Sequence, residues 1–163
     1  MILGPEAEES VWGWLVQELD FTDLNTEVHP LSEEKHIVGR DSKASIVLGE
    51  ALCRGLVEEA SQDDPNQFSR HHFLVKKAVG DEVAVLTDLS LNGTWVNGVK
   101  VGQDRQMILL HCTTISLVGP SCKVFQYLDR ATMDSLYPSE ITSKYLVSDF
   151  LGSGSTAEVR VTE

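Results

Sequence analysis

The sequence predicts an all-β protein in which two sheets pack as a sandwich, and three observations predict it. From Val11 to Leu128, short apolar or alternating runs are separated by turn residues, which is typical of strands. Few stretches that are long enough for a helix show a period of 3.6 residues. The candidate strands are also numerous and closely spaced, and such a set usually closes as a β-sandwich.

Eleven segments carry the strand pattern, and turn residues bound them. Gly39 ends the third segment, and the Asn-Gly pair at residues 97–98 is typical of a tight hairpin turn between the seventh and the eighth. The longest interruption, residues 49–68, has a weak helical pattern in its first half, and connections this long are usually functional or disordered. The segments cover residues 12–19, 25–29, 35–39, 45–48, 72–79, 82–89, 94–96, 99–101, 107–110, 114–119 and 123–128.

After the last of these segments the amino-acid composition of the chain changes. The stretch that begins at Asp129 is polar and contains one proline, which is typical of a linker. The final residues then have the pattern of a strand, a Gly-Ser turn and a second strand. We therefore expect an acidic N-terminal segment at residues 1–10, for which disorder stays open, a β-rich domain at 11–128, a linker at 129–144 and the truncated start of another domain at 145–163.

The charge of the chain restricts its partners. The 163 residues carry a formal net charge of −12, and residues 1–34 contain nine acidic and no basic side chains. Direct binding to nucleic acid through phosphate neutralisation is therefore not expected. An anionic ligand would need a local cationic pocket.

Cysteine usage and hydropathy indicate the compartment. Cys53, Cys112 and Cys122 are odd in number and lack CxxC spacing, so we expect free thiols in a reducing compartment. The N-terminus is acidic where a signal peptide is basic, and no apolar run approaches the roughly 18 residues of a membrane span. The expected location is the cytosol or the nucleus, with no membrane attachment.

The first candidate for a binding site is Gly39-Arg40. The glycine permits a sharp exit from its strand, and the arginine offers a fixed fork of donors that suits a carboxylate or a phosphate. An arginine after a strand is usually a solvated surface residue, so this pair needs support from other motifs.

The second candidate is the run SRHH at residues 69–72. The hydroxyl and backbone N–H of Ser69 and the side chain of Arg70 could face one oxyanion, while His72 braces the loop. Catalysis by Ser69 with a histidine base is disfavoured, because no nucleophile-elbow pattern is present and neighbours in a strand point to opposite faces. His71 and His72 lack a third ligand for a metal at a recognisable spacing. We therefore predict no catalytic and no metal-binding residues.

The third candidate is DLSLNGTWVNG, residues 88–98, which contains two Asn-Gly pairs. A hairpin turn accounts for the second pair. Around the first pair, the hydrogen-bonding side chains of Asp88, Ser90 and Thr94 predict a stiff loop. In such a loop the amide of Asn92 offers a donor and an acceptor to a peptide backbone.

The three motifs GR, SxxH and DxSxNGTxVN, in this order, resemble the forkhead-associated (FHA) domain family. The resemblance implies an FHA-type β-sandwich of about eleven strands, whose loops at one end bind phosphothreonine peptides. By motif, Arg40 and Ser69 contact the phosphate, Arg70 adds charge and Asn92 holds the peptide main chain. The residues that shape the loops are Gly39, His72, Gly93 and Thr94.

The end of the chain resembles a second family. LGSGSTAEV, residues 151–159, is similar to the opening of a protein kinase domain, where a glycine-rich loop covers the ATP phosphates; Ala157 replaces the third glycine. The resemblance assigns Gly152, Gly154 and Val159 to the nucleotide site of a longer parent. The chain ends before any catalytic lysine, HRD or DFG motif, so we expect no enzymatic activity and no cofactor for it. ATP and Mg are expected in the full-length parent.

An FHA domain followed by a linker and a kinase start resembles the family of checkpoint kinase 2, the DNA-damage effector kinases. The resemblance implies a nuclear module that binds phosphothreonine-containing protein segments for phospho-dependent dimerisation or docking. A second copy of the parent kinase is one candidate partner. Two alternatives stay open: the chain serves as part of an active Ser/Thr kinase, or it is an FHA adaptor unrelated to kinases.

Overall fold

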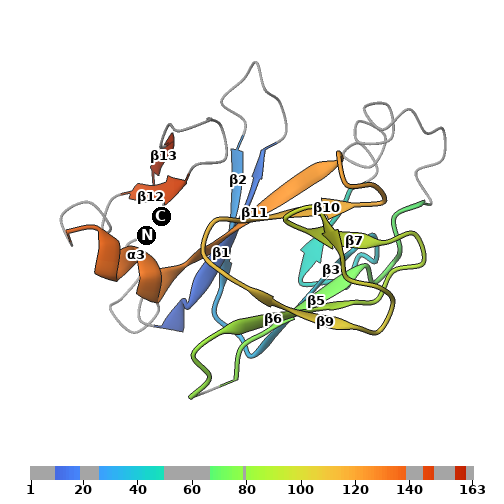
Figure 1. The fold of residues 1–163 in the computed structure, drawn as a ribbon, viewed down its shortest axis with the longest axis horizontal. Helices are drawn as coiled ribbons and strands as arrows, with labels where there is room; N and C mark the ends of the chain where they lie inside the picture. The colour runs from blue at the N-terminus through green and yellow to red at the C-terminus, as the bar shows by residue number, and fades with distance from the viewer. Residues whose placement is uncertain are drawn as a thin grey trace.

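The strands β1 to β11 form two facing sheets (Figure 1). The structure is a computed structural model, and it describes residues 10–18, 26–49, 67–78, 80–138, 145–148 and 157–160. Each of the eleven predicted segments overlaps one strand, so the prediction of an all-β sandwich is confirmed.

The larger sheet has six strands in the order β2-β1-β11-β10-β7-β8, and all neighbours are antiparallel. The N-terminal strand β1 pairs with β11, so the two ends of the sandwich domain lie together (Figure 1). The strands are β1 Gly13–Glu18, β2 Thr26–Leu31, β7 Thr94–Val96, β8 Val99–Lys100, β10 Thr113–Leu117 and β11 Lys123–Asp129.

The smaller sheet has five strands in the order β4-β3-β5-β6-β9. Only the short pair β3 and β4 is parallel among these strands. The strands are β3 Lys35–Gly39, β4 Ile46–Val47, β5 Phe73–Lys76, β6 Ala84–Asp88 and β9 Gln106–Leu109.

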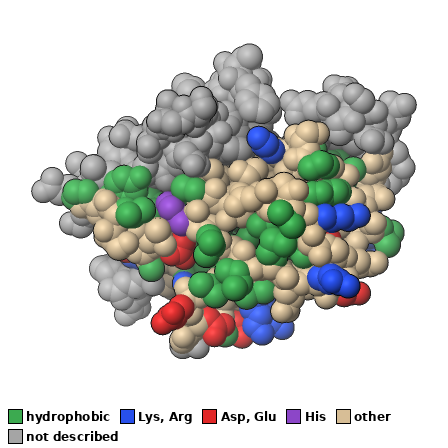
Figure 2. All heavy atoms as spheres, viewed as in Figure 1, with side chains coloured by type: hydrophobic (Ala, Val, Ile, Leu, Met, Phe, Trp, Pro, Cys, Tyr) green, Lys and Arg blue, Asp and Glu red, His purple; other side chains and the backbone are tan. Residues whose placement is uncertain are grey.

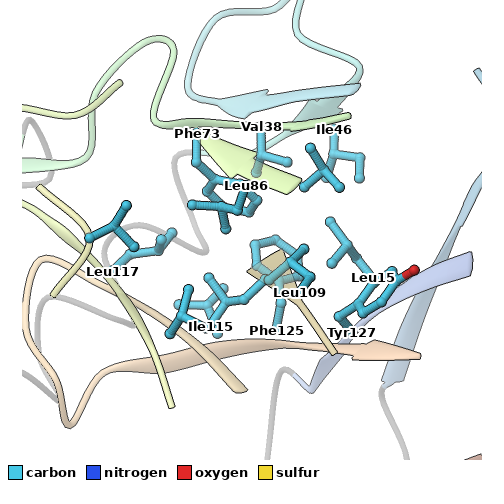
Figure 3. Close-up of a cluster of buried hydrophobic side chains, with 14 of the residues drawn as sticks. Leu15, Val38, Ile46, Phe73, Leu86, Leu109, Ile115, Leu117, Phe125 and Tyr127 are labelled. Carbon is cyan, nitrogen blue, oxygen red and sulfur yellow. The ribbon is translucent and has the colours of Figure 1, made fainter. Parts of the chain in front are cut away.

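Alternating side chains from both sheets form the core (Figure 3). In β6, Ala84 and Leu86 are buried while Val85 between them is half-buried, as expected for a strand with one face on the core. The rings of Phe73 and Phe125 meet edge to face across the two sheets, with centroids 5.9 Å apart. Each fully buried large side chain contributes about 1.5–3 kcal/mol, so this layer holds the sheets together.

Hydrophobic side chains also gather on the outer surface (Figure 2). Ile108 in β9, Leu110 after it and Val83 before β6 are all exposed. An antiparallel sheet can leave one face in solvent, and scattered apolar residues on such a face are common.

A short helix, α3 Arg130–Leu136, follows β11 directly. Asp129 caps it, because its carboxylate accepts the Thr132 N–H at 3.0 Å. Met133 is buried in a small cluster with Val16 and Leu128. The structure therefore differs from the predicted linker at its start, where a buried Met133 and the cap Asp129 place a short helix on the six-stranded sheet.

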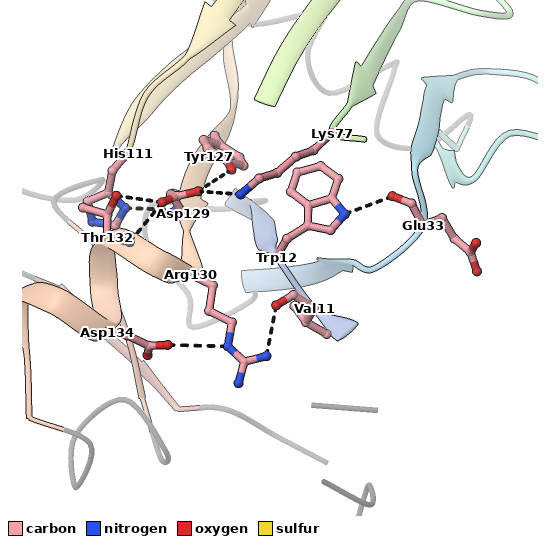
Figure 4. Close-up of polar contacts among 10 residues, drawn as sticks. All are labelled: Val11, Trp12, Glu33, Lys77, His111, Tyr127, Asp129, Arg130, Thr132 and Asp134. Atoms are coloured by element: carbon pink, nitrogen blue, oxygen red, sulfur yellow. Dashed lines mark hydrogen bonds and ion pairs between the residues drawn. The ribbon is translucent and has the colours of Figure 1, made fainter. Parts of the chain in front are cut away.

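Polar contacts fasten the helix to the sandwich (Figure 4). The carboxylate of Asp129 accepts the Tyr127 hydroxyl at 3.0 Å and lies 3.8 Å from Lys77 Nζ. The guanidinium of Arg130 donates to the Val11 carbonyl at 3.0 Å. Burial raises the pKa of Tyr127 and the charge of Asp129 adds to the shift, so this hydroxyl stays a donor.

At the C-terminal end, β12 Tyr145–Ser148 and β13 Ala157–Arg160 pair antiparallel with each other. Residues 1–9, most of the long interruption and residues 149–156 lie outside the described residues, as does Cys53. Neither Cys112 nor Cys122 takes part in a disulfide within the part of the chain that the structure describes. Among the described residues, no helix is long and apolar enough to cross a membrane, and no group of three His, Cys or acidic side chains is placed to hold a metal.

Candidate functional site

Strand pairing brings three loops together at one end of the sandwich. Phe73, the first residue of β5, pairs with Val38 near the end of β3 and with Asp88 at the end of β6. The loops that follow β3 and β6, and the loop that precedes β5, therefore lie side by side. These loops carry the predicted ligand-binding residues Arg40, Ser69, Arg70 and Asn92.

Gly39 is required by a close approach of two backbones. A Cβ atom at this position would lie 1.9 Å from the carbonyl oxygen of Arg70. Two backbone hydrogen bonds of 3.1 Å, from Arg40 N to Ser69 O and from Asp41 N to Arg70 O, join the loops at this point. The sequence predicted a sharp exit from the strand, whereas the structure assigns the glycine to contact with a residue 31 positions away in the chain.

Arg40 lies half-buried at the start of the β3–β4 loop. Its Nε atom donates to the carbonyl oxygen of Phe68, which orients the guanidinium. Its two terminal nitrogens make no hydrogen bond or ion pair with any residue that the structure describes. A fixed arginine with free donors is well suited to an oxyanion.

His72 connects two of the loops from the inside. It is fully buried, its Nδ1 accepts the Ser69 N–H at 3.1 Å, and its Nε2 lies 2.8 Å from the Gly93 carbonyl oxygen. Both contacts are satisfied only when Nε2 carries the hydrogen and the ring is neutral. Burial lowers the pKa of His72, although the Gly93 carbonyl and the charge of Asp88 act in the opposite direction.

Asp88 organises the β6–β7 loop. One carboxylate oxygen, Oδ1, accepts the N–H and the hydroxyl of Ser90 at 2.9 and 2.6 Å, and the Thr94 hydroxyl at 2.9 Å. The Ser90 hydroxyl in turn accepts the Gly93 N–H at 2.9 Å. All of these residues are buried, so the loop is held as a stiff unit.

The two Asn-Gly pairs differ in the structure. Asn97 and Gly98 both have positive φ, 49° and 81°, and connect β7 to β8 as a tight turn. In the first pair only Gly93 has positive φ, 109°, and a Cβ there would lie 2.6 Å from the Trp95 ring. Asn92 is therefore not part of a hairpin turn of this type.

Two hydrogen bonds join the loop of Asn92 to the loop of Ser69. Asn92 is exposed, and its Nδ2 donates to the Gln67 carbonyl at 3.0 Å. The neighbouring Leu91 N–H donates to the Ser69 hydroxyl oxygen at 3.2 Å. Since His72 contacts the backbone N–H of Ser69 and not its hydroxyl, this serine has no histidine base.

Arg70 makes an ion pair that the sequence did not predict. Its guanidinium is 75% exposed and lies 3.6 Å from the Asp41 carboxylate, which also contacts His71 Nε2 at 3.2 Å. The hydrogen bond from the Lys43 N–H lowers the pKa of Asp41, and Arg70 and His71 add to this effect. Asp41 is thus a residue of the site that sequence reasoning missed, although the triplet GRD placed it directly after Arg40.

The predicted nucleotide-site residues do not join this cluster of loops. Gly152 and Gly154 lie outside the described residues, and Val159 is part of β13, where no side chain is described. Their assignment stays a prediction.

The fold and the loops define a class of protein, a β-sandwich that presents polar residues from the loops at one end. The family model of the FHA domain matches residues 36–118, and the chain belongs to the FHA domain family. The FHA-type fold predicted from the sequence is confirmed, and the part that matches is a non-catalytic module.

Individual relatives agree with this assignment. Over 98 residues the chain is 38% identical to the ovarian-specific serine/threonine-protein kinase Lok of Drosophila melanogaster, a match that covers 58% of this chain and 21% of Lok. The N-terminal FHA domain of S. cerevisiae Rad53p, solved with a phosphothreonine peptide, superposes with a TM-score of 0.56 at 18% identity, covering 78% of this chain and all of that one. The MEK1 FHA domain, solved with a HOP1 phosphothreonine peptide, gives 0.52 at 21% identity, covering 74% and 98%.

Proposed function

We propose that this chain binds phosphothreonine-containing peptides at the loop end of its sandwich. The observation that carries the proposal is the convergence of Arg40, Ser69 and Asn92 from three separate loops, which hydrogen bonds between the loops hold in position. The phosphothreonine peptides in the solved relatives support the same class of ligand here.

Each of the three side chains keeps capacity for a ligand. The terminal nitrogens of Arg40 would donate to phosphate oxygens as charge-assisted hydrogen bonds. The Ser69 hydroxyl accepts from the Leu91 N–H and retains its own hydrogen for a phosphate oxygen. Asn92 uses one N–H for the Gln67 carbonyl and retains a second N–H and its Oδ1 for a peptide main chain.

Arg70 would add charge without fixed geometry. The Arg70 side of its ion pair with Asp41 is exposed, and solvent-screened pairs contribute only about 0–1 kcal/mol. A phosphate group, with a charge of about −1.5 to −2, can therefore draw the guanidinium toward itself at small cost.

The test is calorimetric titration of phosphothreonine peptides, chosen from a degenerate library, and of their unphosphorylated counterparts. Arg40→Ala should weaken phosphopeptide binding by about 10- to 150-fold, because it removes charge-assisted hydrogen bonds worth about 1.5–3 kcal/mol. Asn92→Ala should also weaken binding while the fold stays intact, since its side chain is exposed.

Lys43→Ala is the matched control, because Lys43 is an exposed cation in the same loop as Arg40. If positive charge alone mattered, the two substitutions would weaken binding equally. Equal affinity of the wild type for the phosphorylated and unphosphorylated peptides would contradict the proposal.

We further propose that the parent is a Ser/Thr kinase of the checkpoint kinase 2 type, active in nuclear DNA-damage signalling, in which this module mediates phospho-dependent dimerisation or docking. The identity to Lok and the glycine-rich pattern at residues 151–159 support this. The chain spans about a fifth of the length of Lok, 21%. In this proposal, catalysis with ATP and Mg belongs to the parent.

Reading the parent transcript past residue 163 tests the kinase assignment. A catalytic lysine followed by HRD and DFG motifs is expected, and their absence would favour an FHA adaptor unrelated to kinases. The chain by itself should not bind ATP; measurable affinity would favour the alternative in which it acts as part of the kinase. Sedimentation of the parent before and after phosphatase treatment tests the phospho-dependent dimer.

A further inference from the structure

We propose that the carboxylate of Asp88 binds an internal water molecule beneath the β6–β7 loop. The ligand class is a small neutral molecule that donates a hydrogen bond, and the water of the solvent meets that description. The site is separate from the proposed phosphopeptide site, because Asp88 is fully buried whereas a peptide binds at the surface.

The second carboxylate oxygen of Asp88 is a buried acceptor without a donor. Oδ2 has no hydrogen-bond partner among the residues that the structure describes. The first oxygen, Oδ1, accepts three hydrogen bonds, two from Ser90 and one from Thr94. A buried polar group that lacks a partner is costly, and a charged group more so, which indicates that a further donor reaches Oδ2.

The donors of the β6–β7 loop are already engaged. The hydroxyl groups of Ser90 and Thr94 have one hydrogen each, and both hydrogens point at Oδ1 at donor–acceptor distances of 2.6 and 2.9 Å. The Gly93 N–H donates to the Ser90 hydroxyl oxygen at 2.9 Å. None of these hydrogens is left for Oδ2.

His72, the neighbouring ring, is engaged as well. Its Nε2 lies 2.8 Å from the Gly93 carbonyl oxygen, and its Nδ1 accepts the Ser69 N–H at 3.1 Å. The neutral ring has one hydrogen, and that hydrogen is used at Gly93. His72 therefore feels the charge of Asp88 but donates nothing to Oδ2.

Water fits this site better than a cation. A hard cation needs several oxygen ligands, whereas the nearby hydroxyl groups direct their hydrogens toward Oδ1. An internal water needs only two to four polar partners. The Arg105 carbonyl lies beside Asp88, accepts its backbone N–H at 3.0 Å and has a second lone pair for the other hydrogen of the water.

The direct test is a high-resolution crystal structure of the chain, as wild type and as Asp88→Asn. In the wild type, a solvent peak is expected about 2.6–3.0 Å from Asp88 Oδ2. The Asp88→Asn side chain has the same shape and keeps one oxygen acceptor, while its nitrogen can donate to the same water, so the peak should persist. A wild-type map without this peak would overturn the proposal.

Oxygen-17 relaxation dispersion tests the site in solution, because it counts water molecules that stay in the protein longer than it takes to tumble. Asp88→Leu places a methyl group where Oδ2 lies, so this variant should lose one long-lived water relative to the wild type. Asp81→Leu is the matched control, since Asp81 is an exposed carboxylate in the β5–β6 turn, and its count should equal that of the wild type.

Equal counts in the wild type and a folded Asp88→Leu would contradict the proposal. If Asp88→Leu does not fold, the solvent peaks in the wild type and Asp88→Asn decide. Urea midpoints of the wild type in sodium, potassium and choline chloride at equal ionic strength should agree. A midpoint raised by one alkali cation alone would replace the water by a bound cation. Since none of these measurements uses a phosphopeptide, failure of the proposed function would leave them unchanged.

Discussion

At the scale of single residues, His72 acts as a buried connector that functions in its neutral form. It joins the backbone of the loop before β5, through Ser69, to the backbone of the loop after β6, through Gly93. Protonation would place a hydrogen on Nδ1, directly opposite the Ser69 N–H. The loops that carry the proposed binding residues therefore depend on one deprotonated nitrogen.

This arrangement predicts a pH-dependent stability. Because the folded-state pKa of His72 is lowered from about 6.5, its contribution to folding is complete above that pH and is lost as the pH falls through and below it. His72→Gln should lower the free energy of unfolding near neutral pH by about 1–3 kcal/mol, since buried polar groups lose their partner. It should also flatten the pH dependence.

Urea unfolding of wild type and His72→Gln, between about pH 7.5 and pH 5.5, measures both effects. The comparison must use the difference between the two proteins, because burial also lowers the pKa values of His29 and His36. Parallel pH profiles for the two proteins would contradict the assigned role of His72.

At the scale of elements, the site depends on the contact between the end of β3 and the loop before β5. The Arg70 carbonyl crosses directly over Gly39. A backbone hydrogen bond of 2.7 Å from Leu48 N to Gly39 O also holds Gly39 in place. Neither Gly39 nor Arg70 can move away without breaking the backbone hydrogen bonds that position Arg40.

Gly39→Ala should therefore destabilise the fold by more than about 2 kcal/mol, because the added methyl group overlaps backbone atoms that cannot relax. Gly49→Ala is the control: a Cβ there has no heavy atom within 4 Å, so its effect should stay within about 0.5 kcal/mol. Thermal unfolding of both variants gives the comparison, and similar melting temperatures would mean that the crossing backbones can separate.

At the scale of the whole molecule, the packed unit continues past the last strand of the sandwich. α3 covers Val16 and Leu128 with Met133, and Asp129 and Arg130 tie its start to β11 and to Val11 before β1 (Figure 4). This attachment lies where the chain leaves the sandwich.

Met133→Ala should lower the free energy of unfolding by about 2–5 kcal/mol, because it removes a buried side chain and leaves a cavity. Leu136→Ala, in the same helix, should have little effect because Leu136 is 60% exposed. Chemical denaturation of both variants is the measurement. Equal losses would indicate that the helix contributes by its propensity alone and not by packing.

Much of the fold follows from local sequence patterns. The pattern of apolar residues predicted the positions of all eleven strands of the sandwich to within a few residues. This pattern arises because each strand has one face on the core. Three short motifs singled out Arg40, Ser69 and Asn92, because turn and loop chemistry is local as well.

The remaining features depend on contacts between distant residues, which no local pattern encodes. The pairing of Arg70 with Asp41, the crossing over Gly39 and the burial of Met133 arise only when the sheets close. The sequence by itself thus determined the strands and the polar residues of the loops. Tertiary structure decided which of these residues meet and which donors stay free, because the antiparallel pairing of β3, β5 and β6 sets where their ends lie in space.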